Sequence, residues 1–507
     1  MTEPSLDTLG ALVGEHRTAV TIDPDELPMN ARAALDAGFR LALVAGHDDG
    51  PWLRAVYLFT AAAPDRRIEL HVPLDKSRPE LPSLAGLSFP AGRFEREMRD
   101  LFGIQPVGHP APQRLVRHFH WPKGWHPMLH DAGEPPAFGD VEGPYPFREV
   151  EGPGVYEIPV GPVHAGLIEP GHFRFSVVGE TILKLKARLW FVHKGLEKLF
   201  EGQLPETAIE LAERVSGDTA IGHSLAFCRA VGDAHGLTVS LEAHRIRAVL
   251  LEMERLYNHV TDIGALCNDV GHAILNAHAQ RLRERLLRIN DRVTGHRLLR
   301  GALHPGGVRI RELPNPVELR AVGADAAEIV DLALANTVVA DRFTGTAVLT
   351  AEQANDLGAL GYVARASGLA VDARRDHPIP GVAPPTTHAH TEGDVLSRFL
   401  VRADEISTSI ELITQLTGQL GGRTDVSMAM LDPPGSTRSG VGIVEGWRGT
   451  IVHRVELAAD GTLSRVKIVD PSFHNWPALP VALADTIVPD FPLVNKSFNL
   501  SYAGNDL

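Results

Sequence analysis

The stretch that most clearly indicates the fold runs from Leu241 to Asp269 and reads LEAHRIRAVLLEMERLYNHVTDIGALCND. Its apolar residues recur every three or four positions without a proline, which is typical of a long helix that buries one face. Residues 205–231, 277–300, 324–340 and 393–420 repeat this periodicity. Residues 180–201 have the same spacing, at Ile182, Leu185, Leu189, Val192, Leu196 and Leu199. The sequence therefore predicts a bundle of long helices from about residue 155 onward.

Short β elements accompany these helices. Residues 450–457 and 463–469 alternate around Asp460-Gly461, a pattern that predicts a hairpin. Toward the N-terminus, residues 26–38 and 94–102 have helical spacing. Strand-like runs lie between these two helices at residues 39–44, 52–60 and 68–72. The predicted fold is an α+β N-terminal domain (1–105) followed by a mainly α domain (155–507) with small β additions.

A proline-rich connector joins the two predicted domains. Ten prolines fall between Pro106 and Pro153. Proline lacks the amide donor that helix interiors and central strands need. We therefore expect residues 106–154 to be irregular, and the aromatic residues Phe119, Trp121 and Trp125 favour a packed connector over a loose linker.

Composition excludes several classes of function. The chain has 49 basic and 63 acidic residues, a net charge of −14, which argues against nucleic acid as the main partner. Two cysteines, Cys228 and Cys267, cannot supply the four sulfurs that a thiolate-ligated cluster usually takes, and they suit a reducing cytoplasm. The N-terminal residues lack the pattern of a secretory signal, and no uncharged apolar run approaches 18 residues. We expect any membrane link to be made through partner proteins.

Several motifs resemble one family of redox complexes. Residues 93–110, RFEREMRDLFGIQPVGHP, resemble the signature of the small hydrophilic 30-kDa-type subunit of complex I, whose role is docking. Five later stretches resemble, in the same order, the large subunit of energy-converting, formate hydrogenlyase-type nickel-iron hydrogenases and the 49-kDa-type subunit of complex I. They are GPVHAGLIEPGHFRF (161–175), FVHKGLEK (191–198), AERVSGDTAIGHS (212–224), DPSFHNW (470–476) and KSFNLSYAGNDL (496–507). The resemblance implies that both subunits are fused here in one chain of an oxidoreductase complex.

The resemblance also implies a loss of metal ligands. In the hydrogenases two Cys-x-x-Cys pairs hold nickel and iron, and they correspond here to Ser216 with Thr219 and to Ser501 with Gly504. Thiolates are soft ligands that deprotonate near neutral pH, whereas an alcohol stays protonated and glycine has no side chain. We therefore predict that the chain binds no metal, and that these four positions gather around one pocket.

Proton-transfer candidates survive in the same motifs. By resemblance, Glu169 occupies the position that passes protons to and from the hydrogenase metal site, and burial there would raise its pKa. The alternative is that Glu169 pairs with an arginine such as Arg174 or Arg214. His164 and His172 are either members of a proton relay or histidines with a structural role.

A quinone site is another use for the crevice. Complex I surrounds the quinone head group with a histidine, a tyrosine and an aspartate, which fall here on Pro170, Gly217 and Asp262. Proline and glycine cannot donate a side-chain hydrogen bond. Asp262 corresponds to the aspartate of the family's quinone site. The alternative is that it is an ordinary polar residue on a helix. The remaining candidates for a different donor set are Ser216, Asp218, Thr219, His223 and Tyr502.

The stretch EGWRG (445–449) resembles a family segment near the metal site. In the family an arginine there can neutralise a buried acid, a role that would fall on Arg448. The alternative is an ordinary ion pair between Glu445 and Arg448.

Together these features predict a subunit of a complex I-like, hydrogenase-4-like oxidoreductase. The chain would bind no cofactor itself and would meet a small subunit that carries a [4Fe-4S] cluster. Antiporter-like membrane subunits would hold it at the cytoplasmic face of the cell membrane. Electrons would pass to an acceptor, with quinone as one candidate. A structural or assembly role without chemistry is the alternative, and an active nickel-iron hydrogenase is disfavoured by all four ligand positions.

Overall fold

A five-stranded sheet forms the first unit of this computed structural model, which describes residues 11–14, 16–62, 64–139, 143–164, 168–426 and 431–507. The sheet has the order β1-β2-β5-β4-β3, with β2 and β5 parallel and the other neighbours antiparallel. Its strands are β1 (Ala11–Gly14), β2 (Arg17–Thr21), β3 (Arg40–Asp48), β4 (Trp52–Ala61) and β5 (Arg66–Asp75). Besides residues 1–149, this unit includes Leu189–Lys198 and Asp506.

Helix α3 (Phe89–Phe102) packs against β3 of this sheet. The approach is close at Gly46 of β3, where an added Cβ would lie 2.6 Å from the Phe102 ring. The helix ends at Gly103, whose φ of 77° lies in the left-handed region that glycine tolerates. The remaining elements of the unit are η1 (Pro24–Glu26), α2 (Leu27–Asp36) and the parallel pair of β6 (Glu80–Pro82) with β7 (Gln105–Val107).

The connector forms no helix or strand in its described residues between β7 and β8 (Val155–Val160). It is nevertheless packed against α3. The buried Asp100 carboxylate accepts hydrogen bonds from the backbone nitrogens of Leu115 (2.7 Å), Val116 (2.9 Å) and Arg117 (3.2 Å). The described part of the connector after β7 is thus irregular, and it is packed against α3 at residues 115–117.

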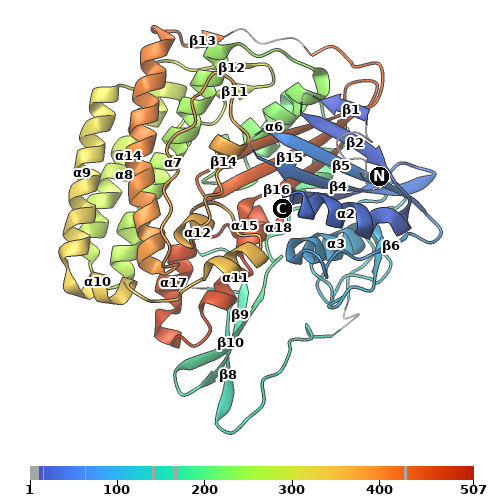
Figure 1. Cartoon of the computed structure of the whole chain (residues 1–507), viewed down its shortest axis with the longest axis horizontal. Helices are drawn as coiled ribbons and strands as arrows, with labels where there is room; N and C mark the ends of the chain where they lie inside the picture. Colours follow the sequence, from blue (N-terminus) through green and yellow to red (C-terminus); the bar gives the residue numbers. More distant parts are fainter. Residues whose placement is uncertain (1–10, 15, 63, 140–142, 165–167, 427–430) are drawn as a thin grey trace. The chain divides into compact units, whose positions relative to one another are not determined.

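The second unit is mainly helical and comprises Val150–Arg188, Leu199–Asn505 and Leu507. Its longest helices are α7 (Leu241–Asp269), α8 (Ala273–Thr294), α9 (Pro316–Ala335) and α14 (Val395–Leu420), which pack side by side (Figure 1). The shorter ones are α5 (Pro205–Ala212), α6 (Ala220–His235), α10 (Thr337–Phe343), α11 (Ala351–Asp356), α12 (Gly361–Ala366), α13 (Ala373–Asp376), α15 (Pro471–Asn475), α16 (Ala478–Ala482), η2 (Val488–Asp490), α17 (Phe491–Phe498) and α18 (Tyr502–Asp506).

A three-stranded antiparallel sheet supports α6. It consists of β14 (Arg438–Gly446), β15 (Gly449–Leu457) and β16 (Leu463–Val469), and the predicted hairpin is its β15–β16 pair. Glycine is required where α6 crosses β14, because a Cβ on Gly442 would lie 1.9 Å from the Ala226 carbonyl oxygen. Two further sheets are β8 with β9 (His172–Val178) and β10 (Thr181–Arg188), and β11 (Leu303–His304) with β12 (Gly307–Arg309) and β13 (Asp425–Val426).

Three of the predicted helices were wrong. Residues 324–340 span the end of α9 and the start of α10, which are separated at Asn336. Residues 180–201 form strand β10, paired with β9, and then the short helix α4 (Leu196–Leu199). The β9–β10 ladder shifts register between Ile182 and Lys184, so the apolar spacing of a bulged strand imitates a helical one. Residues 205–231 form two helices, α5 and α6, instead of one. The predicted fold class is confirmed, and no helix in the described residues combines the length and apolarity needed to cross a bilayer.

Candidate functional site

The segment between α5 and α6 meets the last turn of the chain in the second unit. Ser216 Oγ lies 2.8 Å from Ser501 Oγ, although 285 residues separate them. Ser216 donates its own proton to Asp218 Oδ1 at 2.9 Å, so Ser501 is the donor between the two hydroxyls. Both serines are buried. The first and third of the predicted ligand positions are therefore in direct contact.

The other two positions join the same cluster. Thr219 Oγ1 donates to Asp218 Oδ1 at 3.0 Å, so Thr219 and Ser216 share one carboxylate. The Gly504 amide donates to Ser501 Oγ at 2.8 Å. The structure thus brings Ser216, Thr219, Ser501 and Gly504 into one hydrogen-bonded site, which we name the serine cluster.

Asp218 anchors the serine cluster through a bidentate ion pair with Arg448. The two Nη–Oδ distances are both 2.7 Å. The Asp218 side chain is 39% exposed, whereas that of Arg448 is only 4% exposed. Burial opposes ionisation of Asp218, but Arg448 and the two hydroxyl donors outweigh it and lower the pKa to about 2. The most exposed polar group of the cluster is therefore a carboxylate.

Arg448 of the EGWRG stretch pairs with an acid, but Asp218 is partly exposed and not buried as the resemblance implies. The ordinary Glu445–Arg448 pair is not formed. Glu445 instead pairs with Arg365 at 2.8 Å. Arg448 is also held by its Nε, which donates to the Asn499 carbonyl at 2.6 Å, and its guanidinium lies 3.9 Å from the Trp447 ring centroid. Sequence reasoning did not identify Asp218 as its partner, because the two lie far apart in the chain.

Asp262 lies one step away from this ion pair. It binds Arg402 Nε at 2.9 Å and accepts a hydrogen bond from Asn499 Nδ2 at 2.7 Å. Asn499 therefore bridges Asp262, through its side chain, and Arg448, through its carbonyl. The acid expected from the quinone site is buried and committed to protein partners.

A buried, hydrogen-bonded series of one carboxylate and two imidazoles lies beside the serine cluster. Asp470 Oδ2 lies 3.0 Å from His223 Nε2, and His223 Nδ1 lies 3.0 Å from His453 Nε2. Burial opposes ionisation of Asp470, but the hydrogen bond and charge of His223 outweigh it and lower the Asp470 pKa. Burial, and next the charge of His223, lower the pKa of His453 well below its usual value. His453 is therefore neutral near pH 7, and His223 links its imidazole to the Asp470 carboxylate.

A second buried carboxyl, that of Glu254, caps helix α6 close to the cluster. Its oxygens accept from the backbone nitrogens of Ile221 (2.7 Å) and Gly222 (2.9 Å). Burial raises the pKa of Glu254 to about 8, against the opposing effect of those two donors. Sequence reasoning missed Glu254 and His453, because nothing local marks them as neighbours of the motif residues. Asp470 lies in the DPSFHNW motif, but no role was predicted for it.

Glu169 and His164 lie on the loop before β9, whose residues 165–167 are outside the described part, and His172 is the first residue of β9. Glu169 Oε2 accepts from the Ala503 amide at 3.2 Å, which places it beside the last turn. Neither arginine suggested as its partner pairs with it: Arg174 binds Glu157 and Arg214 binds Glu210.

His164 and His172 both contact backbone carbonyls. His164 Nε2 lies 2.7 Å from the Gly171 oxygen, and His172 Nδ1 lies 3.0 Å from the Gly161 oxygen. These bonds close the loop and favour the structural role. Tyr502, the last candidate donor, is buried with its ring 4.8 Å from that of Trp476.

Comparison with known proteins identifies the class. Residues 20–135 match the family described as the 30 Kd subunit of respiratory-chain NADH dehydrogenase, and residues 269–437 match its 49 Kd subunit. The chain is thus a subunit of an oxidoreductase complex.

Individual relatives narrow the family. Formate hydrogenlyase subunit 5 of Escherichia coli is 32% identical over 87% of this chain and 79% of its own length. Hydrogenase-4 component G of the same organism is 33% identical (85% and 77%), and the C/D-type NADH-quinone oxidoreductase subunit of Phocaeicola vulgatus is 30% identical (68% and 70%). The chain belongs to this family of fused 30-kDa-type and 49-kDa-type subunits, as its motifs predicted.

A solved structure shares the fold. A chain from the membrane-bound sulfane sulfur reductase, an archaeal respiratory membrane complex, matches with a TM-score of 0.63 and 25% identity, over 70% of this chain and 99% of that one. The relatives are components of complexes, so other subunits are partners of this chain.

Proposed function

We propose that this chain works beside an iron–sulfur small subunit and forms the crevice in which electrons reach an acceptor, without a nickel-iron centre. The observation that carries the proposal is the contact between Ser216 and Ser501. It unites the two family motifs that hold the metals in the hydrogenases, yet it does so with hydroxyl groups.

The donor set argues against nickel and iron on chemical grounds. Soft, deprotonated sulfur suits these metals, whereas the cluster offers neutral hydroxyls and a glycine. The space is also taken, because a Cβ on Gly504 would lie 2.6 Å from the Asp470 carboxyl carbon. Asp470 is held by His223 and by the Ser472 amide (2.7 Å), so it has little freedom to withdraw.

The hydrogen bonds of the serine cluster suit a protonated head group. The Ser216 and Thr219 hydroxyls both donate to Asp218, and Arg448 donates to its two oxygens. Asp218 remains partly exposed as an acceptor. A quinol hydroxyl can donate to this carboxylate, whereas a quinone carbonyl needs a serine or threonine hydroxyl to turn toward it. We therefore take quinone and its reduced form as the acceptor pair to test first.

Sulfane sulfur is a second candidate acceptor. It is favoured by the fold shared with the sulfane sulfur reductase at a TM-score of 0.63. Assays with a quinone and with an organic polysulfide on the same membranes distinguish the two acceptors.

Protons are proposed to move through Glu169. Its partly buried carboxyl contacts the Ala503 amide, one residue from Gly504. The proposed setting is the cytoplasmic face of the cell membrane, where antiporter-like subunits would anchor the complex. The family membership supports this setting.

A pair of variants separates catalysis from a purely structural role. Glu169→Gln keeps the size and an acceptor oxygen but cannot carry a proton, and we expect the complex to assemble while electron transfer in membranes falls at least about tenfold, as for loss of a positioned acid or base. Glu180→Gln makes the same change at an exposed residue after β9 and should leave the rate unchanged. Unchanged rates in both variants, with normal assembly, would support the structural alternative.

A further inference from the structure

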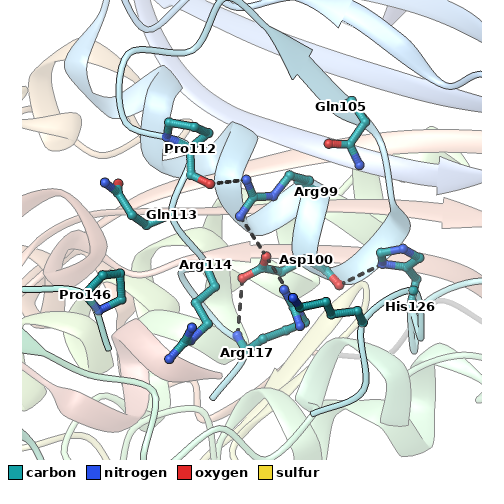
Figure 2. A pocket seen from close by; sticks show the side chains of 11 residues that line it. Arg99, Asp100, Gln105, Pro112, Gln113, Arg114, Arg117, His126 and Pro146 are labelled. Carbon is teal, nitrogen blue, oxygen red and sulfur yellow. Dashed lines mark hydrogen bonds and ion pairs between the residues drawn. The ribbon is translucent and has the colours of Figure 1, made fainter. Parts of the chain in front are cut away.

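A cavity of about 470 Å³ lies in the first unit, at the C-terminal end of α3, where the connector folds back over the helix (Figure 2). Its charged and imidazole-bearing lining residues are Arg99, Asp100, Arg114, Arg117, Lys123 and His126. We name this cavity the basic pocket. None of its lining residues belongs to the serine cluster, so it is independent of the function proposed above.

The lining of the basic pocket carries a clear excess of positive charge. Four cationic side chains face one carboxylate, so the formal balance is 4 − 1 = +3 in a chain whose net charge is −14. His126 does not add to this sum, because burial and the nearby arginines lower its pKa. Such a local excess focuses a positive potential into a concave site.

The single carboxylate is committed to the fold. Asp100 accepts three backbone N–H groups of the connector, and its other oxygen lies 3.3 Å from Arg99 Nη2 and 3.6 Å from Arg117 Nε. Asp100 therefore shapes the wall of the basic pocket and positions two of its arginines. Figure 2 shows the contacts with Arg99 and Arg117 converging on its carboxylate.

The arginines are also held in place by the connector. Arg99 donates to the Pro112 carbonyl, and Arg114 donates to the Gly143 carbonyl at 3.0 Å, with its guanidinium 5.5 Å from the Tyr145 ring centroid. Side chains fixed in this way lose little conformational entropy when a ligand binds.

We propose that the basic pocket binds a phosphate group, carried by a soluble phosphate ester or by a phospholipid headgroup. Guanidinium groups match the geometry of phosphate oxygens, and a net charge of +3 suits a multiply charged group better than a single carboxylate. The volume lies in the range of ligand sites and exceeds that of one phosphate ion, so it has room for part of the molecule that carries the group.

Binding of pyrophosphate and ATP to the purified full chain tests this proposal by titration calorimetry at constant ionic strength. We expect saturable binding that Arg114→Gln and Lys123→Gln each weaken at least about tenfold, the loss expected for one charge-assisted hydrogen bond. Arg32→Gln removes the same charge from the exposed face of α2 and should leave the Kd unchanged. Lys123 is exposed, so its variant is expected to fold even where Arg114 contributes to stability.

Vesicle flotation distinguishes the two sources of the phosphate group. Binding to phosphatidylglycerol vesicles but not to phosphatidylcholine, lost in Lys123→Gln and kept in Arg32→Gln, assigns a lipid headgroup. Saturable binding of pyrophosphate or ATP alone assigns a soluble ligand. The proposal is overturned if neither probe binds, if Arg32→Gln weakens binding as much as Lys123→Gln, or if only an acidic peptide such as polyglutamate binds.

Discussion

Asp470 fills the space that a side chain on Gly504 would need. The Asp470 carboxyl carbon lies 2.6 Å from the ideal Cβ position of Gly504, closer than real Cβ contacts come. Gly504 corresponds by resemblance to a hydrogenase metal ligand. Asp470 is hydrogen-bonded to the buried imidazole of His223, which in turn contacts that of His453. In this structure the space beside Gly504 is therefore occupied by a carboxylate.

The first prediction follows from this close approach. Gly504→Ala should destabilise the protein by about 1–3 kcal/mol, because Asp470 must shift and lengthen its bond to His223. Gly217→Ala is the matched control next to Ser216 of the serine cluster, since its Cβ would meet no atom within 4 Å. Urea unfolding of the purified chain measures both changes. Equal stability of the two variants would show that Asp470 yields without cost.

The ion pair between Asp218 and Arg448 leads to a second prediction. Asp218→Asn should lower the free energy of unfolding by about 2 kcal/mol, because the buried Arg448 loses its carboxylate partner. The loss should be smaller than for a fully buried pair, since the Asp218 side chain is 39% exposed. Asp325→Asn breaks the surface pair with Arg285, where both side chains are at least 34% exposed, and should cost less than about 1 kcal/mol. A comparable loss in both variants would contradict the anchoring role of Asp218.

The same pair should show a pH dependence. The pKa of Asp218 is about 2 in the folded protein, below the value of about 3.9 for an unfolded chain. The folded state therefore binds the proton more weakly, so this contribution to stability is present above pH 4 and is lost as the pH falls toward 2. The difference in unfolding free energy between wild type and Asp218→Asn should narrow over that interval. A difference that stays constant would contradict the lowered pKa.

Glu254 should have the opposite dependence. Its pKa is raised from 4.5 to about 8 in the folded state, so the folded protein holds a proton that the unfolded chain releases between those values. Stability should therefore fall with rising pH from about 4.5 to 8. The Glu254→Gln side chain cannot ionise, so the unfolding free energy of this variant should not fall in this way between pH 4.5 and pH 8. A wild-type slope that survives in the variant would assign the effect to another group.

Sequence periodicity predicted the elements whose backbone hydrogen bonds are local. Residues 241–269 form one helix, α7, over the range that their apolar spacing indicated. Strand β10 could not be recognised in this way, because it depends on pairing with β9 and carries a bulge after Ile182.

The site shows the same division between local and long-range information. The family motifs identified Ser216 and Ser501, and the fold brings their hydroxyls together. The contacts that control charge, such as Asp218 with Arg448, join residues more than 200 positions apart and leave no local pattern. Glu254 was missed for the same reason, since its partners are backbone amides of another helix.

The metal content of the purified complex tests the central claim most directly. Elemental analysis should find iron, supplied by the cluster of the small subunit, and no nickel above the level of a matched preparation without the complex. A nickel-iron hydrogenase purified in parallel confirms that nickel would survive the procedure. Nickel at one atom per chain would contradict the proposal that hydroxyls, a glycine and Asp470 have replaced the metal site.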